Sequence, residues 1–202
     1  MPLTAEERRA VDQYVSEWWA AVADRRGDDW KDRLPDPPVV LMQRAALHHP
    51  NGKVRRFALG VLDHAANDAS TEVFRAALRD PAPVVRLNAL HGLSCERCRV
   101  GELCTDDIVP ALLDVLEHDA SPKVRHASLF PLILMSSRDA RVQPAFARAA
   151  RHDPDPLLRL AAAEAAAGNY KRVKTRKALR RRVAGGEAQV RVGGLGEAGR
   201  AV

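Results

Sequence analysis

The chain has 202 residues, of which 46% are hydrophobic and 29% are charged, a composition that can fold around a sizeable buried core. Charged residues interrupt the apolar ones in the first 22 positions, and no apolar run approaches the roughly 18 residues of a membrane span. We therefore expect a cytoplasmic protein without a signal peptide or a membrane span. In a reducing compartment its three cysteines are not expected to form a structural disulfide.

The net charge of +6 is unevenly distributed along the chain. Residues 171–182 contain eight basic residues and no acidic one, whereas the rest of the chain is slightly negative. Any electrostatic preference for a partner should therefore be local to this segment.

The first predicted element is an N-terminal helix. Thr4 and Glu7 have the spacing of a capping box, in which each side chain binds the backbone N–H of the other residue. An apolar stripe that includes Tyr14, Trp18 and Trp19 follows at helical spacing. Residues 25–38, which are rich in proline toward their end, predict a linker.

A repeated pattern follows, centred on an arginine. The arginines are 31, 39, 34 and 32 residues apart, which is enough for two helices and two turns per unit. In the four clear copies, turn residues such as Asp-Pro come first, and a proline or glycine stands three positions before the arginine, where a helix can begin. Aliphatic residues one position before and four positions after the arginine predict an apolar helix face. The central arginines are Arg55, Arg86, Arg125, Arg159 and, more faintly, Arg191.

A second amphipathic helix precedes the arginine in most copies. These helices are predicted over residues 39–47, 71–78, 107–116 and 144–150. No alternation typical of β-strands competes with them, so each copy predicts a pair of helices.

These residues resemble the HEAT-repeat family, whose hallmark is an aspartate in the turn followed by Val-Arg at the start of the second helix. Asp80, Asp119 and Asp153 match that aspartate, whereas the first copy has His49 and the fifth has Gly185. The resemblance covers roughly residues 37–199. It implies an all-α fold, a right-handed α-α superhelix (a HEAT-repeat solenoid) of about five helical-hairpin units plus an N-terminal capping helix.

The resemblance also suggests how the chain is divided. We expect a capping helix and linker over residues 1–36, the solenoid over 37–184, and a degenerate, frayed repeat over 185–202. The N-terminal helix would cover the exposed end of the first repeat, although it could instead be a peptide-binding patch. The recurrent aspartates and arginines are expected to form a ladder between neighbouring repeats, and a role in ligand binding is the less favoured alternative.

In such a solenoid the first helices form the convex side and the second helices the concave side, where a partner would bind. The candidate contact positions lie one before the recurrent valine and one or five after the arginine. They share no chemistry that names a ligand, so they predict only a protein partner. These positions are Lys53, Arg56, Lys123, His126, Phe130 and Glu164.

All three cysteines fall in one loop of the longest repeat, at residues 95–104. Counted along a helix, His91 and Cys95 lie about 40° apart, roughly opposite the apolar face. Together with Cys98 and Cys104 they could form a closed Cys3His site for a structural zinc ion. Reduced, inert thiols and redox or iron–sulfur chemistry are the alternatives.

Residues 170–184 predict a basic amphipathic helix. It could bind the phosphates of a nucleic acid, bind an acidic protein, or be a solvated outer face. Its scarcity of aromatic residues argues against a base-stacking platform. The basic residues are Lys171, Arg172, Lys174, Arg176, Lys177, Arg180, Arg181 and Arg182.

The sequence contains no P-loop, nucleophile elbow or His-Glu-x-x-His helix. We therefore expect a non-catalytic protein–protein interaction scaffold or adaptor, with structural zinc as its one candidate cofactor. The first alternative is a nucleic-acid-binding protein that uses residues 170–184. The second is a HEAT-like enzyme or lyase whose site is not recognised from the sequence.

Overall fold

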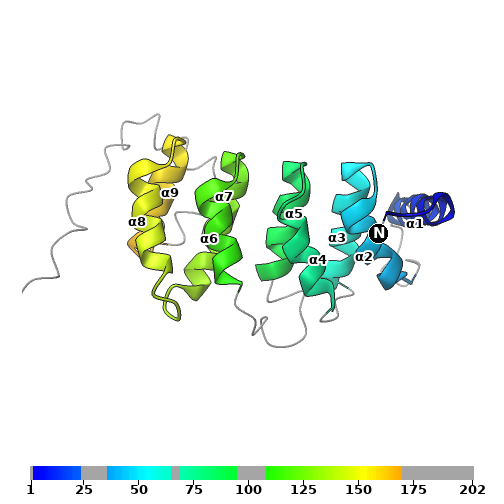
Figure 1. Cartoon of the computed structure of the whole chain (residues 1–202), viewed down its shortest axis with the longest axis horizontal. Helices are drawn as coiled ribbons and strands as arrows, with labels where there is room; N and C mark the ends of the chain where they lie inside the picture. Colours follow the sequence, from blue (N-terminus) through cyan, green and yellow to red (C-terminus); the bar gives the residue numbers. More distant parts are fainter. Residues whose placement is uncertain (1, 24–35, 65–68, 95–107, 170–202) are drawn as a thin grey trace, which may run out of the picture. The chain divides into compact units, whose positions relative to one another are not determined.

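The computed structural model describes residues 2–23, 36–64, 69–94 and 108–169 (Figure 1). All regular secondary structure in these ranges is α-helical, which confirms the all-α prediction. None of the described helices is both long and apolar enough to cross a membrane. The helices are α1 (Ala5–Ala23), α2 (Val39–His48), α3 (Gly52–His64), α4 (Ala69–Ala77), α5 (Pro83–Ser94), α6 (Val109–His118), α7 (Pro122–Met135), α8 (Val142–His152) and α9 (Pro156–Ala166).

The chain divides into two compact units, Met1–Asp106 and Asp107–Val202. The first unit contains α1 to α5 and the second contains α6 to α9. The predicted solenoid of residues 37–184 therefore spans both units. Their boundary falls in the longest of the repeat spacings, between Arg86 and Arg125, where the cysteine loop was predicted.

Each unit is built from two helical hairpins. In the first unit α2 packs on α3 and α4 packs on α5, while α2 also contacts α4 and α3 also contacts α5. The second unit repeats this arrangement with α6, α7, α8 and α9. First helices therefore lie beside first helices and second helices beside second helices, which is the packing of a two-layered helical repeat (Figure 1).

The predicted helix starts are confirmed for the second helices. Gly52, Pro83, Pro122 and Pro156 are the first residues of α3, α5, α7 and α9. A proline is tolerated there because the first N–H groups of a helix have no partner inside it. The first helices differ from their predicted bounds by two residues or fewer at every end; α6, for example, begins at Val109 instead of residue 107.

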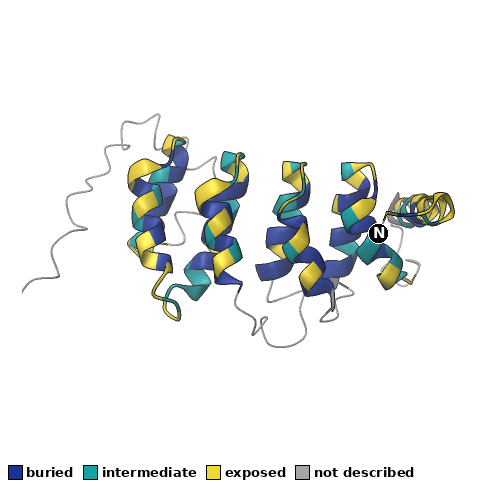
Figure 2. Cartoon of the chain, in the orientation of Figure 1, coloured by how far each residue is buried: buried dark blue, intermediate teal, exposed yellow. Residues whose placement is uncertain are grey.

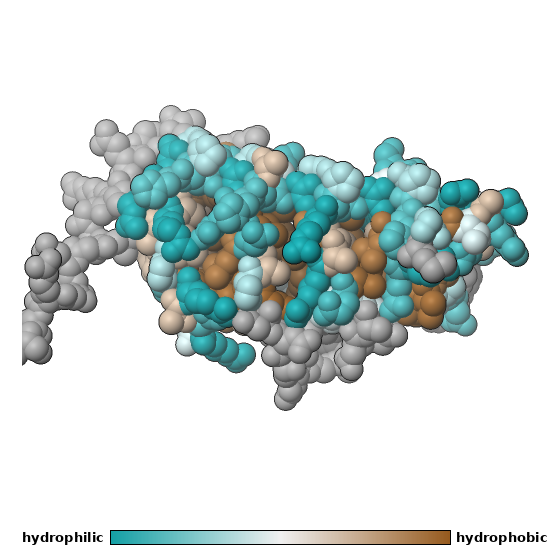
Figure 3. All heavy atoms as spheres, viewed as in Figure 1, coloured by the Kyte–Doolittle hydropathy of each residue, from teal (hydrophilic) through white to brown (hydrophobic). Residues whose placement is uncertain are grey.

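The repeated aliphatic positions make the core of each unit. Val85, Val124 and Leu158, which precede the arginines, have no exposed surface, and Val54 is 8% exposed. Figure 2 shows these buried faces turned toward the neighbouring helices of the same unit. Figure 3 shows hydrophobic atoms between the helices, with hydrophilic side chains around them. Burying each such side chain contributes about 1.5–3 kcal/mol, so the periodic pattern is what holds the hairpins together.

One contact in the first unit depends on the absence of a side chain. A Cβ placed on Gly92 of α5 would lie 2.3 Å from Cε1 of Phe74 on α4. Phe74 is fully buried. The glycine therefore lets the aromatic ring lie against the backbone of α5.

Candidate functional site

The recurrent arginines form a ladder with the turn aspartates within each unit. In the first unit Nε and Nη2 of Arg55 donate to Oδ2 and Oδ1 of Asp80, at 2.6 and 2.9 Å. In the second unit Arg125 makes the same two bonds to Asp153, at 2.8 and 2.9 Å. Such a bidentate pair is the strongest arrangement of a guanidinium and a carboxylate. The predicted ladder is confirmed for these two steps, so these arginines are structural.

The ladder shifts the pKa values of Arg55, Arg125 and Asp80. Hydrogen bonding to Asp80 raises the pKa of Arg55, and hydrogen bonding to Asp153 raises that of Arg125. Burial by itself would raise the pKa of Asp80, but the bonds from Arg55 and from the Ala82 N–H outweigh burial, and the pKa is lowered. The folded chain therefore favours the charged forms of these groups.

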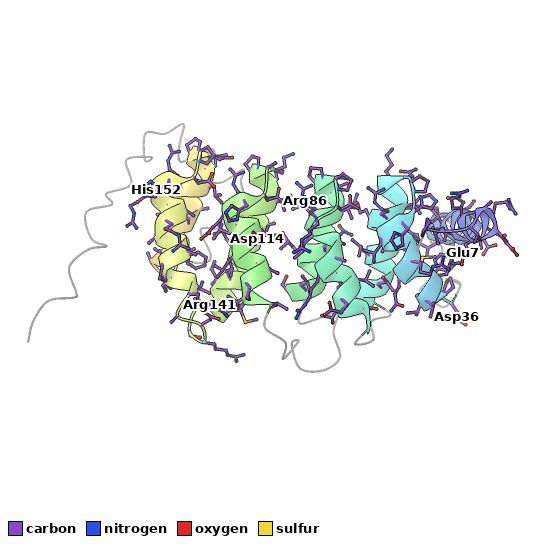
Figure 4. All side chains as sticks on the ribbon, viewed as in Figure 1. Glu7, Asp36, Arg86, Asp114, Arg141 and His152 are labelled. Carbon is purple, nitrogen blue, oxygen red and sulfur yellow. The ribbon has the colours of Figure 1, made fainter. Side chains whose placement is uncertain are left out.

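The turn aspartate makes hydrogen bonds both within its own repeat and to the preceding repeat. Oδ1 of Asp80 and of Asp153 accepts a hydrogen bond at 2.8 Å from the backbone N–H two residues later, which closes the turn. The backbone carbonyls of the same two residues accept from Nη1 of Arg86 and Arg159, both at 2.7 Å. Figure 4 labels Arg86 near the start of α5. Each arginine thus fixes the turn of its own repeat, and Arg55 and Arg125 also bind the next one.

His49 replaces the aspartate in the first repeat and closes the turn in the same way. Its Nδ1 accepts from the Asn51 N–H at 3.2 Å, as the aspartates do in the later turns. Nε2 of His49 lies 3.4 Å from Oδ1 of Asp12 on α1. His49 is 5% exposed, and the part of the chain described before α2 contains no repeat that could supply an arginine. A carboxylate at this position would be buried without a cation.

The helix α1 lies against α2 and α3 of the first repeat. Its capping box is confirmed, because the Glu7 N–H donates to Thr4 Oγ1 at 3.1 Å and the Thr4 N–H donates to Glu7 Oε2 at 2.7 Å. Glu7 also forms an ion pair with Arg44 of α2 (Figure 4). The same side chain therefore starts α1 and attaches it to the repeat.

An aromatic cluster completes the contact between α1 and α3. Tyr14 and Trp18 meet Phe57 of α3 edge to face, with ring centroids 6.2 and 5.1 Å away. Trp19 touches Trp18 at 5.0 Å and is 56% exposed. Most of the predicted apolar stripe of α1 is thus used in covering the first repeat.

The predicted contact positions divide into exposed and buried ones. Lys53, Arg56 and Lys123 are exposed, Phe130 is 44% exposed, and His126 is half-buried. The prediction that Glu164 contacts a partner is wrong, because this residue is only 8% exposed. It occupies the repeat position of Phe130, but α9 buries more of its circumference than α7, so this position does not reach the surface.

One further exposed residue occupies an equivalent position on a second helix. Val84, one position before Val85, is 46% exposed on α5. The positional rule that selects Lys53 and Lys123 selects it too, but an apolar residue there is ordinarily assigned to the core. We call Lys53, Arg56 and Val84 the second-helix surface of the first unit, and Lys123 and Phe130 the second-helix surface of the second unit.

His91, the predicted zinc ligand on α5, is paired with a buried carboxylate. Its Nε2 lies 3.2 Å from Oδ2 of Asp63 on α3, and the two side chains are 61% and 6% exposed. The other oxygen, Oδ1 of Asp63, is buried and has no hydrogen-bond partner in the described part of the chain. No sequence motif includes Asp63, because the packing of α3 on α5 is what brings it to His91.

The remaining predicted sites lie outside the described residues. They are Cys95, Cys98 and Cys104, the basic residues of 171–182, and the fifth repeat of 185–202. The cysteine zinc site and the basic helix therefore stay predictions. Among the residues that the structure does describe, no group of three His, Cys, Asp or Glu side chains could hold a metal ion.

Paired helices stacked in two layers and joined by an Asp–Arg ladder define an α-solenoid repeat protein. Residues 109–198 match the family of HEAT repeats. Comparison with curated proteins and with solved structures gives no match. Residues 109–198 therefore carry HEAT repeats, and HEAT repeats generally mediate interactions between proteins.

Proposed function

We propose that the chain is a non-catalytic scaffold that binds a protein partner through the second-helix surface of each unit. The observation that carries the proposal is the exposure of two apolar side chains on second helices, Val84 at 46% and Phe130 at 44%. Aromatic side chains such as Phe130 are enriched at protein interfaces, and the exposed apolar surface of Val84 could be buried beside such an anchor. Both occupy repeat positions that the resemblance assigns to partner contact.

The charged residues of the same surface indicate the chemistry of the partner. Lys53 and Arg56 are exposed on α3, and Lys123 is exposed on α7. Basic residues around apolar anchors favour a partner segment that combines apolar and acidic side chains, because complementary charge speeds and orients the encounter. The ladder arginines do not contribute, since their guanidinium groups are already paired.

Affinity capture from the native cells, quantified by mass spectrometry, tests this proposal. Phe130→Ala removes an anchor and Lys53→Glu reverses a charge on the second-helix surface. The matched controls on first helices are Val40→Ala, which changes a residue 72% exposed on α2, and Arg151→Glu, which changes an exposed residue on α8.

We expect both surface variants to lower recovery of the partner by about tenfold, equivalent to about 1.4 kcal/mol, and both controls to match the wild type. Equal recovery with all four variants would contradict the proposal. Captured material that is nucleic acid, and that is released steeply by salt, would favour the alternative based on residues 170–184.

A further inference from the structure

The carboxylate of Asp63 is a buried charge with incomplete pairing. Its side chain is 6% exposed, and Oδ1 has no hydrogen-bond partner among the residues that the structure describes. Among the described residues its one ion-pair partner is His91. Burying a charged group is costly unless it is fully paired, so this site lacks positive charge in comparison with the bidentate pairs of the ladder.

The geometry of the pair fits two ligands of one metal ion. Nε2 of His91 and Oδ2 of Asp63 are 3.2 Å apart. A charge-assisted hydrogen bond between nitrogen and oxygen is usually about 2.7–2.9 Å long, whereas two ligands of one tetrahedral zinc ion, each about 2.0–2.1 Å from it, lie about 3.3 Å apart. The observed separation, at the long end of the range for N–H···O hydrogen bonds, also fits two ligands of one ion.

We propose that Asp63 and His91 bind a divalent transition-metal ion of the zinc type. An imidazole nitrogen and a carboxylate oxygen are donors that such an ion prefers, and the ion supplies the positive charge that Asp63 lacks. Because His91 is 61% exposed, the ion can enter from solvent, and water completes its coordination. The site uses Asp63 in place of the cysteines of the predicted Cys3His site, and it does not depend on the proposed scaffold function.

A second histidine–aspartate pair provides a matched control. Nδ1 of His118 lies 3.0 Å from Oδ1 of Asp114 on α6, but these side chains are 70% and 67% exposed. Figure 4 labels Asp114 on α6. Because water solvates both groups, neither requires a bound cation to compensate for burial, and this pair is not expected to bind a metal ion tightly.

Metal titration of the full chain tests the proposal. Protein freed of metal with a chelator is titrated with cobalt(II), followed by its visible absorption, and with zinc, followed by calorimetry. His91→Gln changes an exposed residue and leaves the fold intact, and Asp63→Asn keeps the shape of a buried one. The comparison variants are His118→Gln and the triple substitution of Cys95, Cys98 and Cys104 by serine.

We expect one ion per chain in the wild type, in His118→Gln and in the triple serine variant. His91→Gln and Asp63→Asn should each weaken binding by at least about tenfold. Absence of binding to the wild type, unchanged binding by His91→Gln or by Asp63→Asn, or loss of the ion in the triple serine variant or in His118→Gln would overturn the proposal. Loss of the ion in the serine variant would place it on the cysteine loop. Partner capture is measured separately, so failure here leaves the scaffold proposal standing.

Discussion

Replacing Asp153 with alanine should destabilise the second unit by about 3–5 kcal/mol, because it leaves a buried guanidinium without its counterion. Arg125 is 6% exposed, and its Nε and Nη2 groups would both lose their acceptors. The Nη1 bond to the Asp119 carbonyl, 2.7 Å long, would be retained. The Asp155 N–H would also lose its acceptor in the turn, which adds about 1 kcal/mol. Since small domains are stable by only about 5–15 kcal/mol, this is a large fraction of the total.

Urea unfolding followed by far-ultraviolet circular dichroism measures this loss. Glu117→Ala is the control, because it breaks an ion pair with Arg148 that is largely exposed and should cost less than about 1 kcal/mol. Adding Arg125→Met to Asp153→Ala should recover part of the stability, since the unpaired buried charge is then removed. The reasoning is refuted if Asp153→Ala costs no more than Glu117→Ala, or if adding Arg125→Met only deepens the loss.

Three further predictions concern the first unit. Burial would raise the pKa of Asp80, but hydrogen bonding to Arg55 lowers it below its ordinary 3.8. The ladder therefore stabilises the fold above pH 3.8, and this stabilisation is lost as the pH falls through the lower pKa of the folded state. Wild type and Asp80→Asn should therefore differ in stability at neutral pH and converge in acid, and a gap independent of pH would contradict this. Gly92→Ala should lower the melting temperature, because overpacking against Phe74 costs about 1–3 kcal/mol and outweighs a gain in helix propensity of about 1 kcal/mol; a raised melting temperature would count against it. His49→Asp should cost about 1–3 kcal/mol in urea unfolding and His49→Asn less, because only the first buries an unpaired charge; equal stability of the two variants would argue otherwise.

The helices and their starts could be predicted because they depend on local chemistry. Gly52 and Pro83 begin helices since each stands where N–H groups have no partner, and the aliphatic residues around each arginine define a buried face. The partners of Arg55 and Arg125 lie 25 and 28 residues away. Their pairing was predicted only through the resemblance to HEAT repeats, because spacing alone does not say which charges meet.

Features that depend on the packing of one helix against another could not be predicted. Glu164 and Phe130 share a repeat position, yet only Phe130 is exposed, because α9 is buried over more of its surface. The close approach of Phe74 to Gly92 and the pairing of Asp63 with His91 each join residues on different helices. The spacing of apolar residues within a single helix does not predict such contacts between helices.

Site-specific photo-crosslinking in the native cells tests most directly whether the chain binds a protein partner with its second helices. One crosslinking residue replaces Phe130, which is 44% exposed on the second helix α7. The other replaces Gln143, which is exposed on the first helix α8. We predict a discrete protein adduct from position 130 and none from position 143. Adducts from position 143 alone, or from neither position, would contradict the account.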